Sequence, residues 1–216
     1  RYGLNKPLGL PIKGEGIPVI PQPGTNRWSG VALPWMAFGY GLSVTPLQTL
    51  TLYNAVANDG VMVKPIFVSE IKEWNKTIKK FDTQVINPKI CSQETLDKVH
   101  AVLENVVKKG TGSKLYSKDF SMAGKTGTAQ VNYKDKSKLY YASSFVGYFP
   151  ADEPKYSCIV VVHKPNVTAG YYGADVAGPV FKRIAQKIFT DSPSMNHVKN
   201  IDAKVVSQEK NYSEYY

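Results

Sequence analysis

The sequence predicts an α+β domain in which helices cover an antiparallel β-sheet. Strand-like apolar segments follow one another with short polar or proline-containing links, at residues 120–131, 141–149 and 156–163. Links this short favour consecutive antiparallel strands. Three further segments carry apolar residues at helical spacing, at residues 45–58, 92–108 and 178–188. These helices are expected to pack on the sheet and complete the core.

Length and composition predict a single domain. A chain of 216 residues that is 43% hydrophobic can bury one core. We assign residues 1–190 to this domain. Residues 191–216 form a polar tail without sustained periodicity. Residues 1–37 are rich in proline and glycine and are expected to be irregular.

The first helix has a capping box at its N-terminus. Thr45 is placed at the N-cap, Pro46 at the first helical position and Gln48 at N3. The helix is expected to run to about residue 58 and to end at Gly60. The residues expected on its buried face are Leu47, Leu50, Tyr53 or Asn54, and Ala57.

Short strands and a second helix follow. Residues 61–82 indicate an extended hairpin with its turn at Trp74-Asn75-Lys76. The second helix is expected to begin near Ser92 and to end at the glycine of Lys108-Lys109-Gly110. Its apolar stripe comprises Leu96, Val99, Val102 or Leu103, and Val106.

The last helix is expected to lie across the sheet. It begins at about Gly178-Pro179, where proline suits the first helical turn. Its apolar residues are Val180, Phe181, Ile184 and Ile188. A turn at residues 150–154, which contains two prolines and two acids, separates the two preceding strands.

The formal charge of +10 would suit an anionic partner, but the sequence does not indicate nucleic acid. The lysines are scattered, arginines are few, and no nucleic-acid recognition motif is present. The histidines His100, His163 and His197 show no metal-ligand spacing, so no metal and no cofactor are predicted. Cys158 lies in an apolar strand and is expected to be a buried thiol, and a disulfide with Cys91 is not expected.

The segment Gly124 to Ala129 predicts a site for a carboxylate. Lys125 supplies a cation, Thr126 and Thr128 supply hydroxyls, and Gly127 allows a ligand to approach the backbone. Side chains alternate along a strand, so Lys125 and the two threonines fall on opposite faces. Twist at the edge of the sheet would be needed to bring all three to one cleft. The alternative is a strand with a solvated lysine and two ordinary threonines.

A phosphate-binding loop is a rival interpretation of Gly124-Lys125-Thr126. The pattern G-x-x-x-x-G-K-[ST] requires a glycine where this chain has Asp119, whose carboxylate would repel phosphate. The residues after the lysine indicate a strand, whereas such a loop opens a helix. Both observations exclude the nucleotide interpretation.

Several blocks in fixed order resemble a known family. They are FGYGLSVTPLQTLTLYNAVANDG (38–60), the K-T-G hexad, SSFVGYFP (143–150), KYSCIVVVHKP (155–165) and YYGADVAGPVF (171–181). Together they are similar to the C-terminal part of the transpeptidase domain of class B penicillin-binding proteins, most of all the division-specific penicillin-binding protein 3 (FtsI) type. The resemblance implies a partial serine β-lactamase and penicillin-binding transpeptidase fold, with a five-stranded antiparallel sheet between helices and a separate helical subdomain.

The resemblance also implies residue roles. Lys125 would help set the field for proton transfer, and the hydroxyls of Thr126 and Thr128 would bind the substrate carboxylate. The backbone N–H of Thr128 would be one donor of the oxyanion hole, and Gly127 would keep the approach open. Tyr171 and Tyr172 would form an aromatic wall of the cleft, the alternative being surface tyrosines on a loop.

The family also requires a nucleophilic S-x-x-K serine and an S-x-N triad. The matches in this chain are Ser69-x-x-Lys72, Ser207-x-x-Lys210 and Ser194-x-Asn196. We reject the first because a strand points positions i and i+3 to opposite faces. We reject the other two because they lie in the polar tail. The chain is therefore expected to be a fragment that holds the substrate-binding half of the site, lacks the nucleophile and does not react with penicillin.

For the parent protein, the resemblance implies a peptidoglycan D,D-transpeptidase that cross-links stem peptides at the septum and is a target of β-lactams. It implies anionic envelope polymer and divisome membrane proteins as partners, a location on the periplasmic side of the cell envelope, and an N-terminal inner-membrane anchor outside these residues. The alternatives are a non-catalytic binding module that retains the sheet, an elongation-type transpeptidase, or a β-lactamase or carboxypeptidase fragment.

Overall fold

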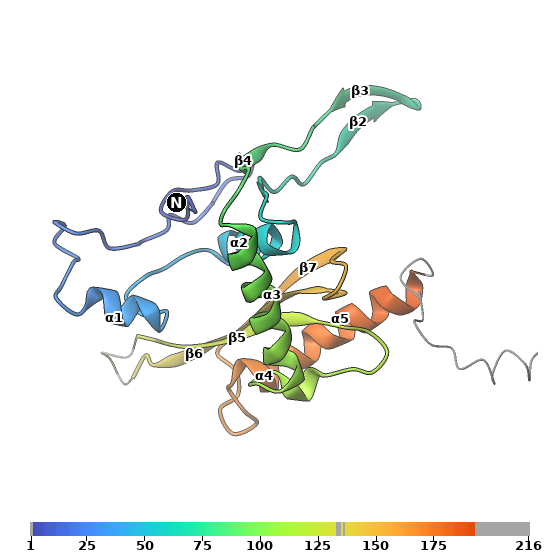
Figure 1. Cartoon of the computed structure of the whole chain (residues 1–216). Coiled ribbons are helices and arrows are strands. Elements are labelled where there is room, and N and C mark those ends of the chain that lie inside the picture. Colours follow the sequence, from blue (N-terminus) through green and yellow to red (C-terminus); the bar gives the residue numbers. More distant parts are fainter. Residues whose placement is uncertain (1, 133–134, 136, 193–216) are drawn as a thin grey trace, which may run out of the picture.

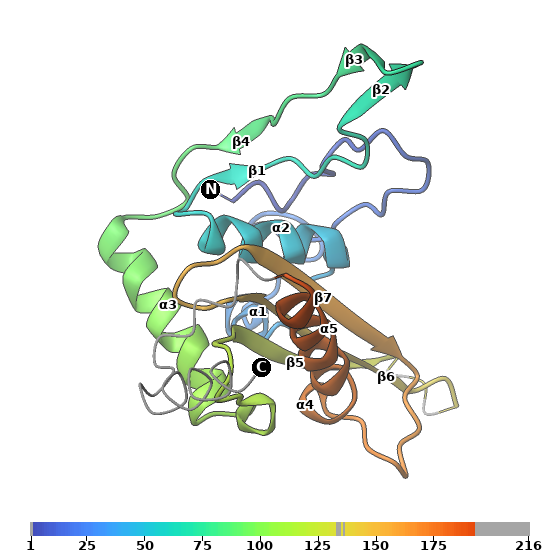
Figure 2. The same cartoon turned by 90° about the vertical axis from the view of Figure 1, so that its right-hand side faces the viewer.

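The computed structural model describes residues 2–132, 135 and 137–192, and it has helices on both faces of a central antiparallel sheet (Figures 1 and 2). The sheet contains β5 (Ala123–Val131), β6 (Tyr140–Phe149) and β7 (Tyr156–His163), in the order β5-β6-β7. Both pairings are antiparallel, as the short links predict. The α+β class is confirmed. The described residues place three strands in this sheet, whereas the resemblance implied five.

Two apolar clusters hold the helices against the sheet. On one face, Phe145 and Phe149 of β6 pack with Phe181 and Ala185 of α5 (Gly178–Asp191). On the other face, Tyr148 packs with residues of α2 (Pro46–Ala57) and α3 (Gln93–Lys108). Successive residues of β6 therefore serve opposite cores, which is the alternation expected of a strand buried on both faces.

The N-terminus of α2 confirms the predicted capping box. Gln48 N–H donates to Thr45 Oγ1 over 3.1 Å, and Thr45 N–H donates to Gln48 Oε1 over 2.9 Å. The helix ends at Ala57, and Gly60, which was expected to stop it, follows with a φ of +81° and donates its N–H to Ala55 O. The predicted buried face was right only in part. Tyr53 and Ala57 are half-buried against the core, but the buried residues of the helix are Gln48, Thr51, Ala55 and Val56.

Burial of Gln48 explains this error. Its side-chain amide donates to Lys6 O over 2.8 Å and to Leu4 O over 3.4 Å, while its oxygen accepts from Thr45. A buried polar side chain is tolerated when its hydrogen bonds are satisfied. The irregular N-terminal segment therefore covers the start of α2 and buries a polar residue that the apolar pattern does not include.

The stripes of α3 and α5 were predicted in part. Ser92 caps α3 by accepting the N–H of Thr95, and Leu96, Leu103 and Val107 are buried. Val102, one of two candidates for its position, is 62% exposed, so Leu103 fills that place. On α5, Phe181 is buried as expected, but Val180 and Ile184 are exposed and Ala185 is buried. A helix presents only one stripe to a flat sheet, and Phe181 and Ala185 lie at its centre.

Two small antiparallel pairs lie apart from the main sheet. β1 (Met62–Val63) pairs with β4 (Val85–Asn87), and β2 (Glu70–Glu73) pairs with β3 (Lys76–Lys80). The hairpin and its turn are confirmed, with positive φ at Trp74 and Asn75. β4 was not predicted. Neither was α1 (Ala32–Ala37), a short helix inside the segment expected to be irregular.

The tail assigned to residues 191–216 lies outside the described residues from position 193 onward. Within the described part, both cysteines are free, and burial raises the pKa of the Cys158 thiol. No helix among the described residues has both the length and the apolar character needed to cross a membrane.

Candidate active site

The K-T-G hexad lies on an edge strand of the sheet. Among the residues that the structure describes, β5 pairs only with β6, with Lys125 opposite Val146 and Thr128 opposite Ser143. The Ala123 and Val146 carbonyl oxygens lie between the two strands, because a Cβ on Gly147 or on Gly124 would collide with them. Backbone groups point alternately to the two sides of a strand. Thr126 and Thr128 therefore direct their N–H and C=O groups to the open edge of β5.

Lys125 folds over this open edge. Its ammonium donates to Thr126 O over 2.8 Å and lies 3.3 Å from Thr126 Oγ1. The lysine side chain has four methylene groups joined by rotatable bonds, so its ammonium can reach around the strand to the opposite face. The flexible side chain of Lys125, and not only strand twist as we expected, thus brings the cation to the threonine side.

Neighbouring segments hold each threonine hydroxyl. Thr126 Oγ1 lies 3.1 Å from Thr111 Oγ1, in the loop that follows α3. Thr128 Oγ1 accepts the N–H of Gly173 over 3.0 Å, at the start of α4 (Gly173–Val176). This bond uses a lone pair of the Thr128 hydroxyl and leaves its hydrogen available as a donor. A hydroxyl hydrogen on Thr128, on the same strand as the ammonium that lies at Thr126, suits a carboxylate ligand.

Glycine is required where α4 meets the strand. A Cβ on Gly173 would lie 2.6 Å from Gly127 O and still closer to Ser144 O. A Cβ on Gly127 would lie 2.5 Å from Ser144 Oγ. Because both positions lack a side chain, the backbone of α4 lies directly on β5, and the Gly173 N–H reaches Thr128.

The two tyrosines before α4 form a stack at the far end of the hexad. The rings of Tyr171 and Tyr172 lie 4.4 Å apart, and Tyr171 stacks on Tyr141 of β6 at 4.2 Å. Tyr141 pairs with Gln130, two residues beyond Thr128. The hydrogen bond that Tyr171 donates to Tyr172 raises the pKa of Tyr171 to about 12.

A serine of β6 fastens this stack to the sheet. Ser143, fully buried and opposite Thr128, donates its hydroxyl to Tyr171 O. Ser143, Thr111 and Gly173 were missed as site residues by sequence reasoning. The only signal was the glycine in YYG, because a hydroxyl in a loop or a strand carries no pattern of its own.

The structure thus brings some of the expected site residues together. Lys125 and Thr126 are in contact, and Thr128 is linked through Gly173 to the tyrosine pair. Tyr171 and Tyr172 adjoin the Thr128 end of the hexad, and no contact with Lys125 is seen. Among the described residues, no three histidine, cysteine, aspartate or glutamate side chains gather closely enough to hold a metal ion.

The S-x-x-K match at Ser69 stands apart from this site. Ser69 immediately precedes β2, in the hairpin that projects from the molecule, well separated from β5 (Figure 1). Lys72 forms an ion pair with Glu70 over 2.6 Å instead of approaching Ser69. The matches at Ser194 and Ser207 lie outside the described residues.

Comparison with known proteins identifies the family. Residues 1–186 match the penicillin binding protein transpeptidase domain. The chain is 33% identical over 190 residues to stage V sporulation protein D of Bacillus subtilis (strain 168), covering 85% of this chain and 28% of that protein. It is 34% identical over 192 residues to peptidoglycan D,D-transpeptidase FtsI of Buchnera aphidicola subsp. Baizongia pistaciae (strain Bp), covering 87% of this chain and 32% of that protein. The chain therefore spans about a third or less of the length of these relatives.

Solved structures have the same fold. The transpeptidase domain of Burkholderia pseudomallei penicillin-binding protein 3 superposes with a TM-score of 0.69 at 29% identity, covering 88% of this chain and 54% of that one. Penicillin-binding protein 2B of Streptococcus pneumoniae (strain R6) gives a TM-score of 0.71 at 23% identity, covering 92% of this chain and 32% of that one. The resemblance inferred from the K-T-G hexad and its neighbouring blocks is confirmed. The chain belongs to the penicillin-binding protein transpeptidase domain family.

Proposed function

We propose that this chain forms the substrate-binding side of a peptidoglycan D,D-transpeptidase site. The observation that carries the proposal is the open edge of β5, where Lys125, Thr126 and Thr128 present an ammonium and two hydroxyls beside backbone groups that do not pair with β6. These groups suit the terminal carboxylate of a stem peptide or of a β-lactam. The relatives named peptidoglycan D,D-transpeptidases support this substrate class.

Each residue has a definite task in this proposal. The Thr128 hydroxyl, held by Gly173, donates to the carboxylate, while the Thr126 hydroxyl and Lys125 provide a second donor and the balancing charge. The Thr128 N–H points to the open edge and stabilises the oxyanion, a contribution of about 3 kcal/mol per donor in acyl transfer. Tyr171 and Tyr172 bound the site at the Thr128 end.

The reaction is acyl transfer through a serine of the parent protein that lies outside these 216 residues. The serine oxygen bonds to the penultimate D-alanine carbonyl carbon, and the terminal D-alanine leaves as an amine after gaining a proton. An amine of a neighbouring stem peptide then attacks the ester, which releases the serine and forms the cross-link. A β-lactam carbonyl would acylate the same serine and stay bound.

The cellular setting is proposed on the same basis. We place the parent protein in the cell envelope, with this domain on the periplasmic side and an N-terminal anchor in the inner membrane. Its partners would be peptidoglycan and membrane proteins of the divisome. The matched relatives include a sporulation protein and peptidoglycan D,D-transpeptidases named FtsI. We propose a septal role for the parent protein on the resemblance to the FtsI type.

A non-catalytic binding module is the second candidate. It is favoured by the lack, among the described residues, of an S-x-x-K pair on a helix near β5. Elongation-type transpeptidases and other serine penicillin-recognising enzymes would use the same K-T-G edge. Acylation of the parent protein by penicillin would distinguish the two candidates, because an enzyme would react and a binding module would not.

We expect Lys125→Gln in the parent protein to slow acylation by fluorescent penicillin about 100-fold, because a charged donor at the β-lactam carboxylate is lost. The rate of labelling measured by gel fluorescence checks this. Lys155→Gln, which removes an exposed lysine at the start of β7, should label at the normal rate. Equal rates for Lys125→Gln and the unchanged protein would remove Lys125 from the proposed site.

The 216-residue chain alone is expected to remain unlabelled by the same penicillin, since the described residues place no S-x-x-K serine beside β5. The check is a gel after prolonged incubation with excess reagent. A stable, heat-resistant adduct on this chain would show that a nucleophile is present and would overturn the assignment of the serine to the rest of the parent.

A further inference from the structure

The β2–β3 hairpin, Glu70–Lys80, projects from the body of the molecule as an arm. Figures 1 and 2 show it extending away from the sheet and from α2. Every residue of both strands is exposed, and within the described part of the chain the two strands pair only with each other. A two-stranded sheet is marginally stable in water without a covering element. The arm therefore adds surface to the protein while adding little to its core.

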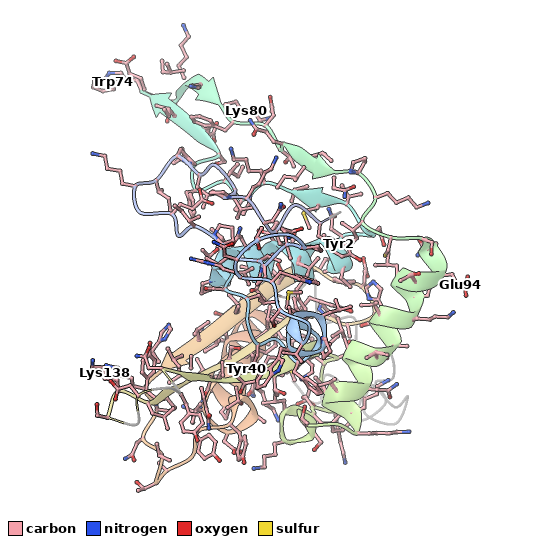
Figure 3. The ribbon with its side chains drawn as sticks, turned by 90° about the vertical axis from the view of Figure 1, so that its left-hand side faces the viewer. Tyr2, Tyr40, Trp74, Lys80, Glu94 and Lys138 are labelled. Atoms are coloured by element: carbon pink, nitrogen blue, oxygen red, sulfur yellow. The ribbon has the colours of Figure 1, made fainter. Side chains whose placement is uncertain are left out.

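The tip of the arm carries a tryptophan that the fold does not need. Trp74 is 94% exposed and has a φ of +52°, and Asn75 follows with a φ of +74° (Figure 3). Two consecutive positive φ values favour Asn-Gly or Asp-Gly, and a bulky side chain is disfavoured there by roughly 1–2 kcal/mol. Burial does not offset this cost, because the ring touches almost nothing. A side chain that is unfavourable for the turn and unused in the core is available for a contact with another molecule, and an exposed aromatic ring is a common anchor in such contacts.

Positive charge surrounds this aromatic ring. The arm has Lys72, Lys76, Lys79 and Lys80 against two glutamates. Lys72 is paired with Glu70, and Lys79 lies 4.8 Å from the centre of the Phe81 ring. Among the residues that the structure describes, Lys76, Lys79 and Lys80 form no ion pair with a carboxylate. The arm thus combines an aromatic plane, an amide and uncompensated ammonium groups.

We propose that the arm binds a peptidoglycan strand away from the K-T-G edge. The Trp74 ring would stack on the C–H face of a sugar ring, Asn75 would hydrogen-bond its hydroxyl or acetamido groups, and the lysines would pair with stem-peptide carboxylates. This inference rests on the proposed function, because it assumes that the polymer is the substrate. It adds a second contact that would hold the strand while a stem peptide occupies β5.

The chemistry of the tip favours this polymer over a membrane surface or a protein strand. Next to Trp74, Glu73 pairs in register with Lys76, so insertion into a bilayer would carry a carboxylate toward anionic headgroups. Addition of a protein strand is disfavoured because the strands are short and rich in lysine. A glycan strand with peptide carboxylates needs only one aromatic plane, nearby polar groups and cations.

The test is co-sedimentation of the 216-residue chain with purified peptidoglycan sacculi over a range of salt concentrations. We expect saturable binding that Trp74→Ala weakens about tenfold, as for the loss of one aromatic anchor. Replacing Lys76, Lys79 and Lys80 together by glutamine should weaken binding and flatten its salt dependence. Circular dichroism spectra of both variants should match the unchanged chain, since the arm lies outside both cores.

Matched control variants distinguish binding by the arm from non-specific adsorption to sacculi. The first control, Trp35→Ala, removes a 51% exposed tryptophan on α1. The second replaces Lys98, Lys155 and Lys187 together by glutamine, which removes three positive charges outside the arm. Both controls should bind sacculi like the unchanged chain. No binding to sacculi, equal loss with the controls, or preference for phosphatidylglycerol vesicles would overturn the proposal. Penicillin labelling of the parent protein should be unchanged by Trp74→Ala. The proposal for the arm and the proposal for the K-T-G site can therefore be refuted independently.

Discussion

Gly173→Ala is expected to lower the free energy of unfolding by about 3 kcal/mol and to release the Thr128 hydroxyl from α4. The new Cβ would lie 2.6 Å from Gly127 O and would also collide with Ser144 O, both of them backbone atoms of paired strands. Neither atom can move without disturbing the β5–β6 pairing. Urea denaturation followed by circular dichroism measures the stability, and amide hydrogen exchange at residue 173 measures loss of the bond to Thr128.

A glycine in open space provides the control. Gly30 has no atom within 4 Å of an added Cβ and no positive φ, so Gly30→Ala should leave stability within about 0.5 kcal/mol of the unchanged chain. If Gly173→Ala were as stable as Gly30→Ala and its residue 173 amide were equally protected, α4 would not lie directly on β5.

Phe181→Ala is expected to destabilise the chain by about 4 kcal/mol. Phe181 is 0% exposed, and its ring packs against Phe145 at 4.7 Å and Phe149 at 5.7 Å between ring centres. Truncation would leave a cavity between α5 and the sheet, lined by rings that cannot collapse into it. The shift of the urea midpoint at constant slope gives the change in stability.

Ile184→Ala on the same helix separates core packing from helix propensity. Ile184 is 37% exposed, and alanine is a better helix former, so this change should cost less than about 1 kcal/mol. Comparable losses at residues 181 and 184 would mean that α5 does not present the Phe181 side to the sheet.

Local signals predicted the elements well. The Thr45 and Gln48 capping box, the glycine after α2 and the turn at Trp74-Asn75 depend on neighbouring residues, and all three appear in the structure. Which face of a helix is buried depends on distant partners. Gln48 is buried because carbonyls of residues 4 and 6 accept from its amide, a contact that apolar periodicity does not contain.

The candidate site also contains residues that local sequence predicted and residues that depend on distant contacts. The hexad with Lys125, Thr126 and Thr128 was found from sequence because its residues are contiguous and their order is typical of the family. Thr111 and Gly173 join it across 15 and 45 residues of chain, through single hydrogen bonds. Such bonds follow from how the loop after α3 and the start of α4 pack on β5, which sequence patterns did not indicate.

The bond from the Lys125 ammonium to Thr126 O also changes what the exposed edge of β5 offers to a second chain. An unpaired strand edge is a template on which a second chain can add a strand, and edge lysines are one way in which proteins prevent this. Lys125 occupies an acceptor that an incoming strand would need and places a charge in its path. Under the proposed function, a stem peptide would bring a carboxylate that could draw the ammonium away, whereas a neutral strand would not. The same lysine would then admit the proposed substrate and disfavour the addition of a second strand.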